Sequence, residues 1–119
     1  MDKQEKGQTG EQLAVDYLAS QGLDILETNW RFGKNEVDII AANNSEIIFV
    51  EVKTRSSDFY GSPESFINKS KQRIIIKAAQ IYTTRFNIDK EVRFDVVSVL
   101  LNSRQKDVKH FEYAFMPQW

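Results

Sequence analysis

Cysteine is absent from the 119-residue chain, and histidine occurs once, at His110. The first absence excludes disulfides, thiolate metal sites and cysteine nucleophiles, and the second excludes a zinc site built from several histidines of one chain. Long apolar runs are also absent, because the longest, such as Ile47–Val50, are far too short to span a bilayer. Only two prolines and five glycines interrupt the chain, and no repeat or linker divides it. We therefore expect a single domain over residues 1–119.

The first residues, MDKQEKGQTGEQ, are polar and lack the apolar segment that a signal peptide requires. We therefore expect a cytoplasmic protein without membrane association. Residues 1–7 contain no hydrophobic side chain after Met1 that would hold them against a core, and the sequence predicts that this segment is flexible.

The charged residues are numerous but unevenly distributed. The 16 basic and 17 acidic residues give a formal net charge of −1, unlike the strongly basic composition of many nucleic-acid-binding domains. However, residues 1–51 contain ten acidic and four basic side chains, whereas residues 52–90 contain three acidic and eight basic ones. Such an asymmetry is informative in itself, and the near-neutral total is compatible with a protein that handles DNA.

Hydrophobic periodicity predicts an α/β domain in which helices flank a short mixed β-sheet, with the order α-β-β-β-α-β-β. The predicted helices cover residues 9–21 and a segment from residue 68 or 70 to about residue 85. The predicted strands cover residues 23–29, 36–42, 46–54, 92–101 and 108–116. Residues 55–68 contain Gly61, Pro63 and several serines, a composition that predicts a loop.

Two short charged motifs occur in adjacent predicted strands. Glu36 and Asp38 are two residues apart and therefore lie on one face of their strand, as do Glu51 and Lys53 on the next. A hairpin turn centred on Asn43-Asn44 predicts that Glu36 lies opposite Glu51, with Asp38 diagonal to it. Carboxylates crowded in this way repel each other unless a hard cation such as Mg²⁺ is bound between them. With Lys53 beside the cation, the pattern is typical of metal-assisted phosphodiester hydrolysis.

Each motif also has a simpler interpretation. An E-x-K pair on a strand is usually a solvated ion pair, and such short motifs are weak individually. Here both motifs are embedded in apolar strands. A charge in such a strand is unfavourable unless it is paired or binds a metal, and this favours the metal site. A structural patch of ion pairs and a non-catalytic module that binds nucleic acid or protein remain as alternatives.

Basic residues that follow the second motif predict a surface for the phosphate backbone of DNA. The candidates are Arg55, Lys69, Lys71 and Arg73. The amides at the start of the second helix add to such a surface, and the alternative for these charges is a solvated helix face. Three loop aromatics are expected either to contact bases or to cover the core, namely Phe59, Tyr60 and Phe66.

Two further polar residues invite a functional interpretation, which the sequence does not favour. Asp95 lies in an otherwise apolar strand, where we expect a buried pair with an arginine rather than catalysis. We expect His110 to be a surface or packed residue, because a lone histidine is seldom a catalyst.

Taken together, several blocks of the sequence resemble the YraN family of small bacterial proteins. The blocks are Gly10–Ala14, Asn29–Arg31, Glu36–Ala41, Phe49–Arg55, Gly61–Pro63, Lys71–Arg73 and Arg93–Val97. This family is similar to the PD-(D/E)XK nuclease-like superfamily, and especially to archaeal Holliday-junction resolvases. The resemblance implies a restriction-endonuclease-like α/β core.

The resemblance also implies individual roles in a metal site. Asp38 and Glu51 match the two metal-binding acids of the superfamily motif, and the backbone carbonyl of Val52 is implied as a further ligand. Lys53 matches the catalytic lysine. One position departs from the motif, because Val37 stands where the superfamily often has a proline, a position that varies widely.

Two helix residues are implied as supporting groups. Glu11 matches an acid of the first helix that points into the site, and Gln72 matches a residue of the second helix beside it. The resulting prediction is a Mg²⁺- or Mn²⁺-dependent endonuclease acting on DNA, including branched or damaged DNA. By analogy with the resolvases, the implied assembly is a homodimer.

Overall fold

The computed structural model describes residues 2–57 and 67–117, in which the elements follow the predicted order. They are α1 (Lys3–Ser20), β1 (Asp24–Phe32), β2 (Asn35–Ala42), β3 (Glu46–Arg55), α2 (Lys69–Arg85), β4 (Glu91–Leu101) and β5 (Lys106–Phe111). The predicted α/β architecture with the order α-β-β-β-α-β-β is therefore confirmed. The loop aromatics Phe59, Tyr60 and Phe66 lie outside the described residues.

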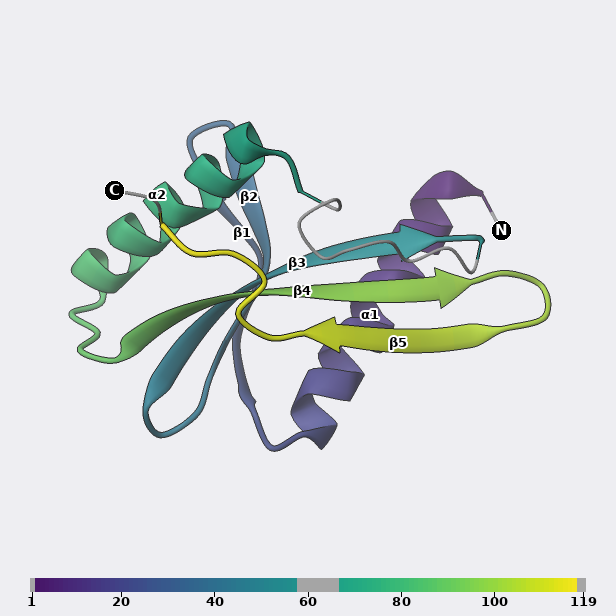
Figure 1. Cartoon of the computed structure of the whole chain (residues 1–119), viewed down its shortest axis with the longest axis horizontal. Coiled ribbons are helices and arrows are strands. Elements are labelled where there is room, and N and C mark those ends of the chain that lie inside the picture. The colour runs from purple at the N-terminus through teal and green to yellow at the C-terminus, as the bar shows by residue number, and fades with distance from the viewer. Residues whose placement is uncertain (1, 58–66, 118–119) are drawn as a thin grey trace.

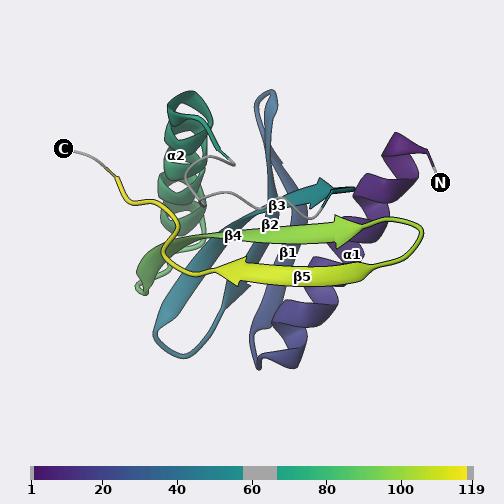
Figure 2. The same ribbon diagram turned by 45° about the vertical axis from the view of Figure 1, so that its right-hand side comes forward.

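The five strands form one mixed sheet in the order β1-β2-β3-β4-β5 (Figure 1). All neighbouring strands are antiparallel except β3 and β4, which are parallel. Parallel neighbours require a long crossover connection, and α2 lies within the segment that links them. The two helices lie on opposite sides of the sheet, as the turned view shows (Figure 2).

Alternation along the central strands divides the core between the two helices. On β3, Phe49 packs in one cluster with Ala78 of α2, whereas the adjacent Ile48 packs in a second cluster with Leu18 of α1. Both β3 residues are fully buried, which explains why this strand reads as a continuous apolar run. Charged residues at the end of β3 therefore continue from a strand that is covered on both faces.

The first helix begins earlier than the sequence predicts. Asp2 accepts a hydrogen bond from the backbone N–H of Glu5 at 2.8 Å, which is the usual interaction of an N-cap residue. As a result, α1 starts at Lys3 and includes residues 3–7. Neither helix in the described part of the chain is long and apolar enough to cross a membrane.

The last strand ends earlier than predicted, at Phe111 rather than residue 116. Tyr113 has a φ of 53°, a left-handed conformation that interrupts an extended strand. The chain then turns back to the sheet, where the N–H of Ala114 donates to the carbonyl of Phe94 at 2.8 Å.

The β2–β3 hairpin has a different register from the predicted one. Ala42 pairs with Ile47 and Ile39 pairs with Val50, so the turn is centred on residues 44–45. Asn43 fixes this turn, because its Oδ1 accepts hydrogen bonds from the N–H groups of residues 45 and 46 at 3.0 and 2.7 Å. The predicted opposition of Glu36 and Glu51 is therefore wrong by two residues. Since side chains alternate with a period of two, the shift leaves both motifs on the predicted faces.

Candidate metal centre

The site begins where β2 and β3 separate. The pairing of the two strands ends at Ile39 and Val50. Asp38 directly precedes Ile39 in β2 and lies just beyond the paired region. Its Oδ2 accepts a hydrogen bond from the backbone N–H of Val52 at 2.8 Å. Because the N–H and C=O of one strand residue point to the same edge, the Val52 carbonyl also faces this gap. A carboxylate and a backbone carbonyl thus meet between the two strands.

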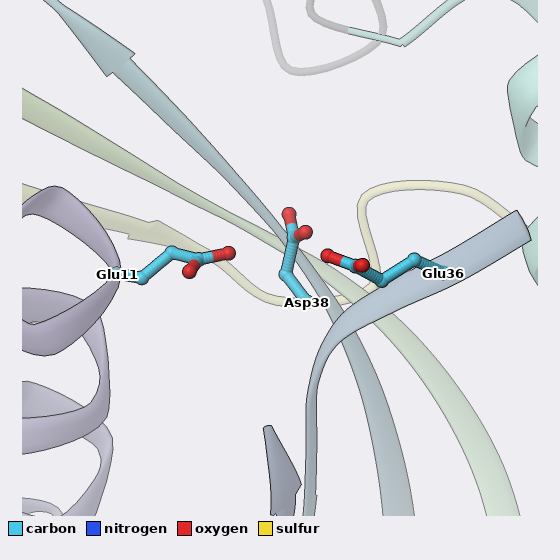
Figure 3. A group of neighbouring side chains, drawn as sticks. All are labelled: Glu11, Glu36 and Asp38. Carbon is cyan, nitrogen blue, oxygen red and sulfur yellow. The ribbon is translucent and has the colours of Figure 1, made fainter. Parts of the chain in front are cut away.

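Two glutamates from other parts of the chain join Asp38. Glu11 reaches it from α1 and Glu36 from the outer part of β2 (Figure 3). One carboxylate oxygen from each of the three residues lies within 4.8 Å of the others. This spacing allows a single cation to contact oxygens of all three side chains.

Asn29 connects the two glutamates. Its Nδ2 donates to Glu11 Oε1 and to Glu36 Oε1, both at 2.9 Å. Asn29 has a φ of 51°, in the left-handed region that asparagine tolerates better than most residues. Sequence reasoning missed this role, although Asn29 begins one of the blocks that carry the family resemblance.

The fourth acid of the site, Glu51, lies on β3 and is only 5% exposed. The Nζ atoms of Lys53 and Lys71 each lie 3.9 Å from its Oε2, which is ion-pair distance but too long for hydrogen bonding. Glu51 is also close enough to Asp38 for its negative charge to act on that carboxyl group.

Burial and the neighbouring Glu51 charge raise the pKa of Asp38 to about 8, against the opposing effects of the Val52 N–H and Lys71. Burial is also the main cause that raises the pKa of Glu11, with contributions from Asp38 and Glu36. The site therefore contains more acidic groups than its own cations and donors can stabilise in the ionised form.

A close approach between α1 and β3 brings Glu11 to the site. A Cβ atom at Gly10 would lie 2.0 Å from Oγ1 of Thr54, so only glycine allows this packing. The neighbouring Glu11 is thereby held beside the gap between β2 and β3. A hollow of about 420 Å³ at this place is lined by residues that include Glu11, Asn29, Glu36, Asp38 and Val52.

Three of the predicted residues of α2 line a second hollow. Gln72 is 7% exposed, and its Nε2 donates to the carbonyl of Ile67 at 3.1 Å. It lines the second hollow, of about 380 Å³, together with Lys69 and Arg73. The second hollow shares no lining residue with the first. The fourth predicted residue of α2, Lys71, lies at ion-pair distance from Glu51 instead.

Arg55 occupies the last position of β3. Alternation along the strand places it on the same face as Glu51 and Lys53. The predicted basic residues therefore form two groups. Lys53, Arg55 and Lys71 make up the first, and Lys69 and Arg73 line the second hollow.

A second cluster of buried charges lies on β4, around the fully buried Asp95. Arg93 donates to its two carboxylate oxygens from Nε at 3.0 Å and from Nη2 at 2.9 Å, and His110 Nε2 lies 2.7 Å from Oδ2. The N–H of Tyr113 adds a bond of 3.1 Å to Oδ1. Burial alone would raise the pKa of Asp95, but the bonds from His110 and Arg93 outweigh it and hold the pKa below its usual range. The predicted buried pair of Asp95 with an arginine is confirmed.

With the geometry described, comparison with known proteins gives the family. The profile of "Uncharacterised protein family UPF0102" matches residues 10–99. The chain belongs to this family. The UPF0102 protein of Flavobacterium psychrophilum is 43% identical over 109 residues, which cover 92% of each chain. That of Parabacteroides distasonis is 45% identical over 109 residues, which cover 92% of this chain and 90% of its own.

The UPF0102 family is the YraN family, so the resemblance drawn from the sequence blocks is confirmed as membership. Among solved structures, the Ca²⁺ complex of SfsA from Pyrococcus furiosus matches with a TM-score of 0.37 and 14% identity. The match covers 94% of this chain and 64% of the SfsA chain.

Proposed function

We propose that this UPF0102 protein is a Mg²⁺- or Mn²⁺-dependent endonuclease that hydrolyses phosphodiester bonds in DNA. The observation that carries the proposal is the convergence of Asp38, Glu51 and Lys53 at the point where β2 and β3 separate. These residues come from two strands, and α1 adds a third acid, Glu11. The resemblance of the same residues to the PD-(D/E)XK motif supports the assignment.

The donor set fits a hard divalent cation. All candidate ligands are oxygens, which Mg²⁺ and Mn²⁺ prefer over nitrogen or sulfur. Asp38, Glu51 and the Val52 carbonyl would hold the ion, and Glu11 and Glu36 stand close enough to Asp38 to contribute. Burial and the Glu51 charge raise the pKa of Asp38 by more than Lys71 and the Val52 N–H lower it, and a bound cation would add further compensation.

The residues of the chain have separable tasks in the proposed reaction. The N–H of Val52 fixes the Asp38 carboxylate, and Asn29 orients Glu11 and Glu36. A bound divalent cation would polarise the phosphodiester and lower the pKa of an attacking water. Lys53 would orient that water or stabilise the negative charge that develops on the phosphoryl group.

DNA is the proposed substrate because of where the positive charges lie. Lys53 and Lys71 lie beside Glu51, and Arg55 follows on the same face of β3. The hollow lined by Lys69 and Arg73 adds further positive charge along α2. Phosphate contacts of this kind bind DNA independently of its sequence. Five of the eight basic residues between positions 52 and 90 belong to this proposed surface.

The test is cleavage of single-stranded, duplex, flap and four-way DNA in Mn²⁺, in Mg²⁺ and in EDTA. We expect metal-dependent cleavage of at least one substrate by the wild type and its loss in Lys53→Met. Lys90→Met serves as the matched control, because Lys90 lies at the opposite end of the sheet and donates to the carbonyl of Asn43. Binding of DNA without cleavage in any metal would replace the proposal by a non-catalytic module, and cleavage that survives Lys53→Met would place the site elsewhere.

A further inference from the structure

Ser98 is a buried polar residue without an evident role in packing. It lies in the middle of β4 and is 0% exposed. Among residues 2–57 and 67–117, no group forms a hydrogen bond with its Oγ. Nearly all buried hydroxyl groups in proteins have a partner, because an unpaired one is unfavourable. The Ser98 hydroxyl is therefore available to a partner that another state of the protein supplies.

The register of the sheet places Ser98 directly beside Lys53. The two residues are partners in the parallel β3–β4 ladder. Val97 and Val99 pack in the cluster that contains α1, so Ser98 projects from the opposite face. Val52 packs in that same cluster, so Lys53 shares the face of Ser98.

The chemistry of the two side chains is complementary. An ammonium has three N–H donors, and a hydroxyl oxygen has two lone pairs. The Lys53 Nζ lies 3.9 Å from Glu51 Oε2, beyond hydrogen-bonding distance. The other strand neighbour of Ser98 is Lys109, whose Nζ lies over the ring of Phe111, 5.6 Å from its centroid.

We infer that Ser98 is a positioning residue for Lys53: its hydroxyl accepts a hydrogen bond from the Lys53 ammonium when Glu51 engages a divalent cation. This inference rests on the proposed function. While Glu51 is free, its negative charge attracts the Lys53 ammonium. Once the Glu51 carboxylate coordinates the cation, it attracts the Lys53 ammonium less strongly. The Ser98 hydroxyl then provides a fixed acceptor that keeps the ammonium beside the reacting phosphate.

The first measurement is the kinetics of Ser98→Ala, which removes the hydroxyl and little else. Loss of a group that orients another typically costs 10–100-fold in activity. We expect kcat to fall by roughly 10-fold with KM for DNA unchanged, because Ser98 does not reach the substrate. Ser103→Ala, in the exposed β4–β5 turn, should retain wild-type kinetics.

The second measurement is thermal melting with and without Mn²⁺. Without metal, Ser98→Ala should melt no lower than the wild type, since it removes an unpaired buried hydroxyl. With Mn²⁺, the rise in Tm should be smaller in Ser98→Ala than in the wild type. In a Lys53→Met background the same substitution should leave the rise in Tm unchanged, because the partner has been removed.

The outcomes separate the two proposals. Cleavage by the wild type combined with wild-type kcat in Ser98→Ala would overturn the role of Ser98 alone. A markedly lower Tm of metal-free Ser98→Ala would also overturn it, because the hydroxyl would then already be paired. Absence of both metal binding and cleavage in the wild type would overturn the proposed function, and the role of Ser98 with it.

Discussion

Asp38 and Asp95 are two acids of one sheet in opposite electrostatic situations. Asp95 is fully buried and receives hydrogen bonds from Arg93, His110 and the N–H of Tyr113. Asp38 accepts one bond from the N–H of Val52 and faces other carboxyl groups. The pKa of Asp95 is accordingly lowered, whereas that of Asp38 is raised to about 8.

The difference indicates what each carboxylate is for. The protein itself compensates the charge of Asp95, so this residue stabilises the fold by joining β4 to β5 and to the chain that follows. The protein compensates the charge of Asp38 only in part, and we infer that a bound cation completes the compensation. Substitutions at the two positions should therefore have opposite consequences for stability and activity.

The largest effect is expected from Asp38→Asn. Removing one group that stabilises a transition state typically costs about 100-fold or more in rate, and we expect a loss of at least that size in Mn²⁺-dependent DNA cleavage. Relief of the repulsion with Glu51 should leave the free energy of unfolding unchanged or higher. Cleavage assays and urea unfolding in EDTA measure the two quantities, and a large loss of stability would contradict the contrast with Asp95.

Asp95→Asn should mainly affect stability. It leaves Arg93 without its principal buried counter-charge, and breaking a buried pair in this way costs about 3 kcal/mol. Urea unfolding should show this decrease, while the residual folded protein still binds metal. Asp89→Asn, at an exposed position, is the matched control and should unfold like the wild type.

Gly10→Ala tests the packing that carries Glu11 to the site. The added Cβ would meet Thr54 Oγ1 at 2.0 Å, and such overpacking typically costs about 1–3 kcal/mol. Gly7→Ala is the control in the same helix, because a Cβ there meets nothing within 4 Å. We expect the control to be more stable than the wild type by up to about 1 kcal/mol, as alanine favours helix. Equal stabilities of the two variants would mean that α1 does not need its close contact with β3.

The last comparison between the two aspartates is the pH dependence of unfolding. The pKa of Asp38 is about 8 in the folded protein and near 3.8 when unfolded. Between these values the folded state binds more protons, so metal-free stability should decrease as pH rises. Asp95 has a lowered pKa, so its contribution is present near neutral pH and is lost at acidic pH. Asp38→Asn should remove the first trend and Asp95→Asn the second, as measured by urea unfolding across pH in EDTA.

Much of this fold and part of the site could be predicted from the sequence because they depend on local patterns. Strand alternation correctly predicts that Glu51 and Lys53 share one face of β3. It also predicts that Asp38 lies near them, and this holds although the predicted register is wrong by two residues. A shift of two keeps every side chain on its face. A shift of one would have separated the two motifs.

The remaining features depend on contacts between distant segments. The sequence does not reveal where β2 and β3 separate, or that Asn29 adopts a left-handed conformation and joins Glu11 to Glu36. It also does not show that the Gln72 side chain donates a hydrogen bond to the carbonyl of Ile67. The partners of Asp95 beyond Arg93 come from β5 and the residues after it, which only the tertiary structure brings together.

Calorimetric titration of Mn²⁺ into the metal-free wild type, Asp38→Asn and Asp95→Asn tests the central claim most directly. We predict saturable binding to the wild type, its loss in Asp38→Asn and its retention in the folded fraction of Asp95→Asn. Absence of binding to the wild type at millimolar Mn²⁺, or unchanged binding to Asp38→Asn, would contradict the assignment of a metal centre between β2 and β3.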